Sequence, residues 1–229
     1  MKTLFKTLMF ILFLCLALIG SWALVHMPDR YKPWKPLQTI DEGGPFFKMK
    51  LSALSGDYDT CTTVLSRSDV DFEQVNDRQS GGCNLTDQIH LNRGLAPYSA
   101  TVQGTCPLIV ALSAWEDTVL APAARRHFDS SVASITHYGI FSCRNVRGST
   151  TRRSQHASAN AIDIAAITLA DGTRISVLDD WDDTNEKGAF LRDLHQGACG
   201  IFSGVLGPDY NALHRDHFHF DLGPYNLCR

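Results

Sequence analysis

The chain begins with a long apolar stretch and continues with shorter periodic and alternating patterns. Eighteen uncharged residues, from Leu8 to Val25, follow the positive charges of Lys2 and Lys6. A run of this length nearly crosses a bilayer, and the lysines favour a cytoplasmic start. We therefore expect residues 1–25 to form a signal anchor or a signal peptide, with an uncleaved anchor favoured over cleavage at the small residues 21–23.

The next two segments, residues 26–45 and 46–104, differ in composition. The first is rich in Pro, Lys and Gly and contains "YKPWKP", which is typical of a linker. The second has a short helical pattern, the alternating sequence "VDFEQV", turn residues in "SGGC" and another short strand near Ile89. These patterns predict a small α+β lead-in over residues 46–104.

Residues 105–229 alternate between helical and strand patterns. "TCPLIVALSAWEDTVLAPAARRHF", with a cap candidate at Thr105, predicts a helix that is interrupted before Pro122. "VASITHYGIFSC" predicts a strand, "AIDIAAITLADGTRISVL" a hairpin, and residues 186–199 another helix. The expected architecture of this domain is α+β, with an antiparallel β-sheet flanked by helices.

The last strand pattern is "HFHFD", residues 217–221. Alternation in a strand places Phe218 and Phe220 on one face, which we expect to be buried. His217, His219 and Asp221 then share the other face. A strand of this kind can line a site with nitrogen and oxygen ligands.

Composition and charge narrow the class of protein. The chain has 229 residues, 44% of them hydrophobic and 20% charged, which is enough for one substantial domain. The formal net charge is −3, and the Lys and Arg residues form no long cluster. Nucleic acid is therefore not an expected partner.

Seven cysteines are present, and the N-terminal one, Cys15, lies inside the apolar run. No pair of the others has the close spacing of a zinc ribbon or a thioredoxin site. An even number of cysteines in an exported chain predicts disulfides, and we expect Cys61 to pair with Cys83 because both lie in one N-terminal stretch. The six cysteines beyond the apolar run are at positions 61, 83, 106, 143, 199 and 228.

His156 and Asp163 lie seven positions apart in "RRSQHASANAIDIAAI". Along a helix they would be about 10 Å apart, and along one strand over about 20 Å apart. If the chain folds back at residues 157–160, however, their side chains can converge on one metal ion. Imidazole and carboxylate ligands suit Zn²⁺, and three protein ligands leave a fourth position for water.

These residues carry a family resemblance. "SQHASANAID" resembles the S-x-H-x-x-G-x-A-x-D motif of the zinc peptidases of bacterial cell walls, which include D-alanyl-D-alanine carboxypeptidases and lysostaphin. The resemblance implies a hedgehog-like zinc peptidase core with His156, Asp163 and His219 as metal ligands. It also implies Asp216, three positions before the third ligand, as general base. Ala159 stands where the motif has Gly, and Ala disfavours the positive φ angles open to Gly.

A second resemblance covers the chain from about residue 37 to its end. "AARRHF", "FSCRNV", "SQHASANAIDI", "GACGIF", "LGPDYN" and "HRDHFHFD" resemble, in order, motifs of the bacterial extensin-like C-terminal domain family. The Pro-rich repeats of structural plant-wall extensins are absent from this sequence.

Further residues are assigned from these comparisons. Arg144, in "FSCRN", resembles an S-x-R segment that lies over the substrate pocket of carboxypeptidase relatives; its guanidinium suits an oxyanion or a carboxylate, and a structural role stays open. His217 can support either role, proton acceptance with Asp216 or oxyanion binding with Arg144. His214 is a substitute ligand candidate, whereas Asp221 is a candidate to hold a ligand imidazole by its second nitrogen.

The expected function is zinc-dependent hydrolysis of amide bonds in peptidoglycan stem peptides or cross-links, in the periplasm and tethered to the inner membrane. Two alternatives stay open. The domain can be a non-catalytic module that binds peptidoglycan or supports the envelope, or a metal-dependent hydrolase of another envelope peptide or small ester. Lone histidines without a partner motif, such as His127 and His195, are expected to be structural.

Overall fold

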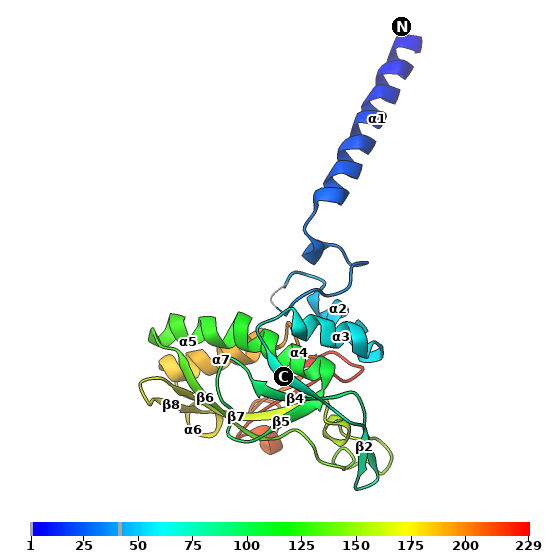
Figure 1. Cartoon of the computed structure of the whole chain (residues 1–229). Helices are drawn as coiled ribbons and strands as arrows, with labels where there is room; N and C mark the ends of the chain where they lie inside the picture. Colours follow the sequence, from blue (N-terminus) through cyan, green and yellow to red (C-terminus); the bar gives the residue numbers. More distant parts are fainter. Residues whose placement is uncertain (1, 41–42) are drawn as a thin grey trace.

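The computed structural model describes residues 2–40 and 43–229. Met1 of the predicted N-terminal segment and residues 41–42 of the predicted linker lie outside the described residues. Helix α1 (Lys2–His26) extends away from the folded part of the chain (Figure 1). Residues Thr3–His26 are long and apolar enough to cross a membrane, a test that signal sequences also pass.

The described residues form helices and strands in a mixed order, as the α+β prediction requires. The α-helices after α1 are α2 (Phe47–Ala53), α3 (Tyr58–Ser66), α4 (Cys106–Trp115), α5 (Ala121–Phe128), α6 (Val177–Asp180) and α7 (Glu186–Ala198). Shorter helical segments are η1 (Asp29–Tyr31), η2 (Leu54–Gly56), η3 (Glu116–Leu120), η4 (Gln155–Ser158) and η5 (Ala212–His214). The strands are β1 (Asp71–Val75), β2 (Arg78–Ser80), β3 (Cys83–Leu85), β4 (Gln88–Arg93), β5 (Val102–Thr105), β6 (Val132–Gly139), β7 (Ala161–Leu169), β8 (Arg174–Ser176), β9 (Gly204–Leu206), β10 (Phe218–Asp221) and β11 (Leu227–Cys228).

The main sheet has six strands in the order β11-β9-β10-β7-β6, with β8 paired to β7. All of its pairings are antiparallel except β11 with β9. The predicted hairpin is therefore β7 and β8, and the predicted "HFHFD" strand is β10, central in the sheet. A smaller antiparallel sheet, β1-β4-β5, and the ribbon β2-β3 come from the lead-in.

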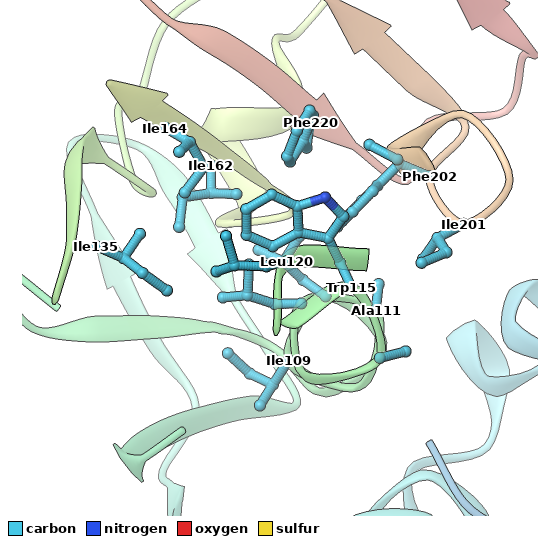
Figure 2. Close-up of a cluster of buried hydrophobic side chains, with 14 of the residues drawn as sticks. Ile109, Ala111, Trp115, Leu120, Ile135, Ile162, Ile164, Ile201, Phe202 and Phe220 are labelled. Atoms are coloured by element: carbon cyan, nitrogen blue, oxygen red, sulfur yellow. The ribbon is translucent and has the colours of Figure 1, made fainter. Parts of the chain in front are cut away.

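Helix α4 lies at the centre of the core. All ten of its residues are buried, as expected for a helix that is apolar on every side. Trp115, at its end, packs edge-to-face on Phe220 of β10, and Phe220 stacks on Phe202 (Figure 2). Ile162 and Ile164 of β7 lie in the same cluster (Figure 2). One face of β7 and β10 is thus fixed against α4, which leaves their alternate residues on the opposite face.

The helical path continues past Pro122. The interruption predicted before this residue is the π-helical segment η3, which joins α4 to α5. Pro122 directly follows the π turn, in which the Ala121 N–H bonds to the Glu116 carbonyl, so the regular ladder that its missing N–H would break is already interrupted there.

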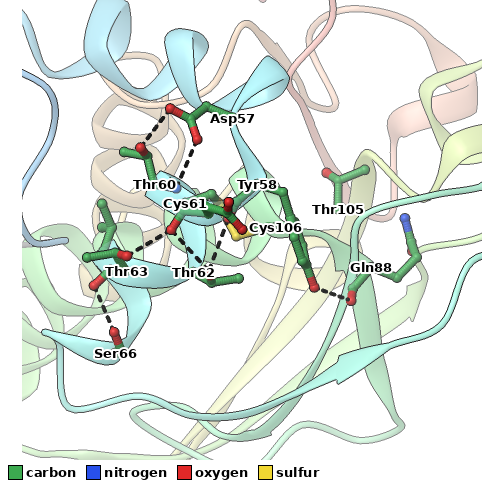
Figure 3. Close-up of a disulfide and its surroundings, with 12 residues drawn as sticks. Asp57, Tyr58, Thr60, Cys61, Thr62, Thr63, Ser66, Gln88, Thr105 and Cys106 are labelled. Carbon is green, nitrogen blue, oxygen red and sulfur yellow. Dashed lines mark hydrogen bonds between the residues drawn. A yellow bond between two sulfur atoms is a disulfide. The ribbon is translucent and has the colours of Figure 1, made fainter.

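The six cysteines beyond α1 form three disulfides, but the predicted pairing of Cys61 with Cys83 is wrong. Cys61 of α3 bonds Cys106 at the start of α4, in the buried layer between the two helices (Figure 3). Cys83 of β3 bonds Cys143, and Cys199 bonds Cys228. Proximity in the sequence fails here because the β2-β3 ribbon carries Cys83 away from α3 and towards the segment before η4.

The end of the predicted linker packs on the domain. Leu37 and Ile40 are buried and belong to the main hydrophobic cluster, which also contains residues from the lead-in and from the C-terminal strands. A single core therefore joins the two parts that the sequence pattern separates at residue 104.

Candidate metal centre

The turn that carries His156 is a short 3₁₀ helix capped at both ends. The Ser154 hydroxyl accepts a hydrogen bond from the His156 N–H, and the backbone N–H of Asn160 donates to the Gln155 carbonyl. Ala159 follows with φ +54°, in the left-handed region. The chain thus folds back at residues 157–160, and Ala159 adopts a left-handed conformation that Gly takes more easily than Ala.

The sheet register brings the other two predicted ligands together. Asp163 of β7 lies directly opposite His219 of β10. Their neighbours Ile164 and Phe218 are also paired and are buried in the core. Because the side-chain period of a strand is two, the burial of these apolar neighbours directs both Asp163 and His219 to the other face.

The three predicted ligand atoms form a triangle. His219 Nδ1 is 2.9 Å from Asp163 Oδ1 and 3.1 Å from His156 Nε2, and His156 Nε2 is 3.2 Å from Asp163 Oδ1. Tetrahedral ligands of zinc lie about 3.3 Å from one another when each is about 2.0–2.1 Å from the metal. The triangle therefore fits a zinc ion that keeps a fourth position free.

The outer nitrogen of each imidazole is bonded to an acceptor. His156 Nδ1 is 2.9 Å from the Ile140 carbonyl oxygen, and His219 Nε2 is 2.9 Å from Asp221 Oδ2. Because these oxygens only accept, the outer nitrogens carry protons, and each ring, when neutral, would direct its lone pair towards a metal ion in the triangle. Such outer-shell bonds are the usual way in which proteins orient metal-ligating histidines.

Asp221 takes the supporting position proposed for it from the sequence. It is 2% exposed, and its oxygens accept hydrogen bonds from the Gly223 N–H and the Tyr225 hydroxyl, both at 2.7 Å. Gly204 of β9 allows this approach, because a Cβ at that position would lie 2.4 Å from Asp221 Oδ2. The hydrogen bonds from Gly223 and Tyr225, and the close approach of Gly204, therefore hold the carboxylate against the His219 ring.

The electrostatics of the cluster favour a positive charge at its centre. Burial opposes the protonated form of His219, but its hydrogen bonds to Asp163 and Asp221 outweigh this and raise its pKa to about 9. Burial likewise opposes the ionised form of Asp163, yet hydrogen bonds from His156 and His219 lower its pKa below the usual range. A divalent cation can supply this charge while both imidazoles stay neutral.

Two further predicted residues form a chain that ends at the triangle. His217 Nε2 is 3.5 Å from Asp163 Oδ1, and His217 Nδ1 is 2.8 Å from Asp216 Oδ1. Within the described residues, no hydrogen bond or ion pair joins Asp216 to the three ligand residues. The predicted general base thus contacts the centre through the His217 ring, which also packs edge-on against Tyr138.

The structure places His214 and Arg144 at the rim of the site. The His214 ring centroid is 5.9 Å from that of His219, and its Nδ1 is bonded to Asn211, so it is not part of the triangle. Burial, together with the positive charges of His219, His217 and Arg144, lowers the pKa of His214 to about 4. Arg144 itself is exposed on the segment before η4.

Tyr225 and the Ile140 carbonyl have roles that the sequence did not reveal. Tyr225 has only its place four residues after Asp221 as a signal. The Ile140 carbonyl has none, because a backbone acceptor leaves no trace in the sequence.

Comparison with known proteins identifies the family. The family model described as "Extensin-like protein C-terminus" matches residues 59–229, most of the chain. The chain therefore belongs to the extensin-like protein C-terminus family, and the match begins somewhat later than the resemblance noted from residue 37. No curated protein and no solved structure matches the chain.

Proposed function

We propose that this chain is a zinc-dependent hydrolase that cuts amide bonds in peptidoglycan stem peptides or cross-links. The observation that carries the proposal is the triangle of His156 Nε2, Asp163 Oδ1 and His219 Nδ1, with mutual distances of 2.9–3.2 Å. The resemblance of "SQHASANAID" to the motif of cell-wall zinc peptidases, with the hedgehog-like core that it implies, supplies the substrate class.

The cellular location is part of the proposal. Helix α1 is long enough to anchor the chain in the inner membrane, and three disulfides suit an oxidising compartment such as the periplasm. Peptidoglycan lies in that compartment. Its peptides are the expected partners, and nucleic acid is not.

Zinc, when bound by His156, Asp163 and His219, polarises the scissile carbonyl and lowers the pKa of water to about 7. The protein supplies the proton acceptor. Because His217 Nδ1–H is donated to Asp216, the lone pair of Nε2 faces the centre and can take a proton from the attacking water. Asp216 then stabilises the imidazolium, and His217 returns the proton to the leaving amine nitrogen.

Arg144 has a separate role in this proposal. Its guanidinium, on the segment joined to the His156 turn by the Ser142 N–H, binds the developing oxyanion or a carboxylate of the substrate. Loss of an oxyanion donor typically costs about 2.7–4 kcal/mol of transition-state stabilisation.

The test is to incubate the full chain, in a non-ionic detergent, with purified peptidoglycan and to count new peptide ends, with and without a chelator. We expect release that depends on metal and is lost in His219→Ala but kept in His127→Ala. Release that survives the chelator or the His219 substitution would reject the mechanism. Zinc binding with no release from the wall or from model peptides and esters would favour the non-catalytic binding module.

A further inference from the structure

Four arginines lie within ten residues next to the candidate metal centre. They are Arg144, Arg147, Arg152 and Arg153, all exposed. The sequence contains no Asp or Glu from residue 130 to residue 162. Among the described residues, none of the four arginines forms an ion pair, so their charge is available to a ligand.

The arginines are carried by a fixed hairpin, residues 144–154. The Val146 N–H donates to the Arg152 carbonyl at 2.9 Å, and the Ser154 N–H donates to the Arg144 carbonyl at 3.1 Å. Just before it, the disulfide between Cys83 and Cys143 ties the hairpin to the β2-β3 ribbon. The Ser142 N–H also donates to the carbonyl of His156, so the hairpin is held directly against a ligand-bearing turn.

The pairing of the hairpin sorts its arginines onto two faces. Asn145 pairs with Arg153 as an antiparallel bridge, so these two residues share one face. Arg144 and Arg152 flank that pair and share the other face. They are diagonal cross-strand neighbours, a relation in which two residues lie roughly 7–8 Å apart. Arg152 and Arg153 are therefore adjacent, identical in charge and opposite in direction.

The face with Arg144 and Arg152 is the one near the site. Ser154, on this same face, is buried and caps the turn of His156. Arg144 acts electrostatically on His214, and Arg152 acts on Tyr225, the phenol bonded to Asp221. The bridge and the Ser154 cap thus place both arginines on the hairpin face that is joined to the His156 turn.

We infer that Arg152 is a specificity-determining residue that works with Arg144, and that together they select peptides carrying two free carboxylates. The inference rests on the proposed function. Two separated guanidinium groups, each a fork that matches one carboxylate, are better suited to two acidic groups of one chain than to a single anion. Arg153, on the far face, takes no part in this recognition.

Binding can be measured without turnover on the full chain in non-ionic detergent, with metal removed by a chelator. The probes are a synthetic stem peptide ending in D-alanyl-D-alanine with two free carboxylates, its two mono-amides and its diamide, each labelled with an uncharged dye for fluorescence anisotropy. Arg152→Gln is the test variant and Arg153→Gln the matched control. Because a charge-assisted hydrogen bond contributes about 1.5–3 kcal/mol, we expect Arg152→Gln to raise the Kd for the diacid about tenfold or more.

The expected pattern has three parts. Arg153→Gln changes the Kd for the diacid less than about twofold, each amidation weakens binding to the unsubstituted chain, and Arg152→Gln no longer distinguishes one of the two mono-amides from the diacid. Equal effects of the two substitutions, no effect of either, or no saturable binding by the unsubstituted chain would overturn the inference. The pattern in a chain that hydrolyses no peptide would support the hairpin assignment and refute the proposed function; metal-dependent hydrolysis without the pattern would do the reverse.

Discussion

Two histidines of this protein lie between pairs of carboxylates, and only one of them belongs to a candidate metal centre. His127 of α5 is bonded through Nδ1 to Glu186 and through Nε2 to Asp193, 2.7 Å away. His219 of β10 is bonded in the same way to Asp163 and Asp221. The two side chains are equally buried, each 12% exposed. A histidine flanked by two acids is therefore not, by itself, a sign of metal binding.

The two clusters differ because the His219 cluster contains a third potential metal ligand, His156. At His127, one proton on each ring nitrogen satisfies both carboxylates, and an imidazolium completes the cluster. At His219, the Nε2 lone pair of His156 also points into the centre, 3.1 Å from Nδ1, and the proton of His156 is already donated to the Ile140 carbonyl. When both rings are neutral, two imidazole lone pairs and one carboxylate meet there, a set that a divalent cation satisfies better than a proton does.

The largest expected effect is on zinc content, which should distinguish His219 from His127. His219→Ala removes a predicted zinc ligand, and we expect it to reduce bound zinc from near one equivalent to near zero and to abolish hydrolysis. The loss of affinity should exceed the 10–100-fold that removal of an outer-shell partner typically causes. Metal analysis of the purified full chain measures the first effect.

His127→Ala is the matched control, because it removes the same side chain from the other His-carboxylate cluster. It should keep its zinc and its activity. Equal zinc content in the two variants would erase the distinction between the clusters.

A smaller effect is expected when only the support of His219 is altered. Asp221→Asn keeps the shape of the side chain but removes its charge, and we expect zinc affinity to fall about 10–100-fold. Gly204→Ala should act in the same direction, because its Cβ would lie 2.4 Å from Asp221 Oδ2 and displace the carboxylate. Competition with a chelator of known affinity measures both. Unchanged affinity in both variants would mean that Asp221 does not orient a ligand.

The His127 cluster should instead contribute to the free energy of unfolding, in a way that depends on pH. Burial opposes protonation of His127, but hydrogen bonds to Asp193 and Glu186 outweigh it and raise its pKa above the ordinary 6.5. The resulting stabilisation is present below about pH 6.5 and is lost as the pH rises through the folded-state pKa.

We therefore expect His127→Gln to lower the free energy of unfolding by about 1 kcal/mol or less at pH 5.5, and by a smaller amount at pH 8.5. Chemical denaturation at the two pH values measures this difference. A deficit that grows with pH would contradict the sign.

The smallest effect concerns the turn after His156. Ala159 has φ +54°, which disfavours Ala relative to Gly by about 1–2 kcal/mol, but Ala159→Gly also removes a buried methyl group and adds entropy to the unfolded chain. These terms oppose one another, so we expect a change in unfolding free energy within about 1 kcal/mol and unchanged zinc content. A loss of zinc would show that the Ala159 methyl group shapes the site.

The sequence predicted which residues share a face of a strand. It did not predict which residues of other segments they contact. Alternation in "HFHFD" was enough to predict that Phe218 and Phe220 are buried and that His219 lies on the opposite face, because strand periodicity is local. The opposition of His219 to Asp163 depends on a register set by packing against α4, and the disulfide of Cys61 with Cys106 depends on the same packing. The proton positions on His156 and His219 depend on a carbonyl and a carboxylate that no local pattern places there.

The position of His217 between Asp216 and the centre was also beyond the sequence. Spacing alone cannot tell which of two adjacent side chains faces a site when both precede the strand. The hairpin of residues 144–154 is a similar case. Arg152 and Arg153 are adjacent in the sequence, and only the bridge between Asn145 and Arg153 shows which face of the hairpin each one occupies.

X-ray absorption at the zinc edge, on the full chain purified with zinc, tests the central claim most directly. The account predicts one zinc per chain with nitrogen and oxygen ligands at about 2.0–2.2 Å and no sulfur. A chain without zinc would contradict it. So would sulfur at about 2.3 Å, which would place the metal at His195, Cys199 and Cys228, where the described structure has a disulfide.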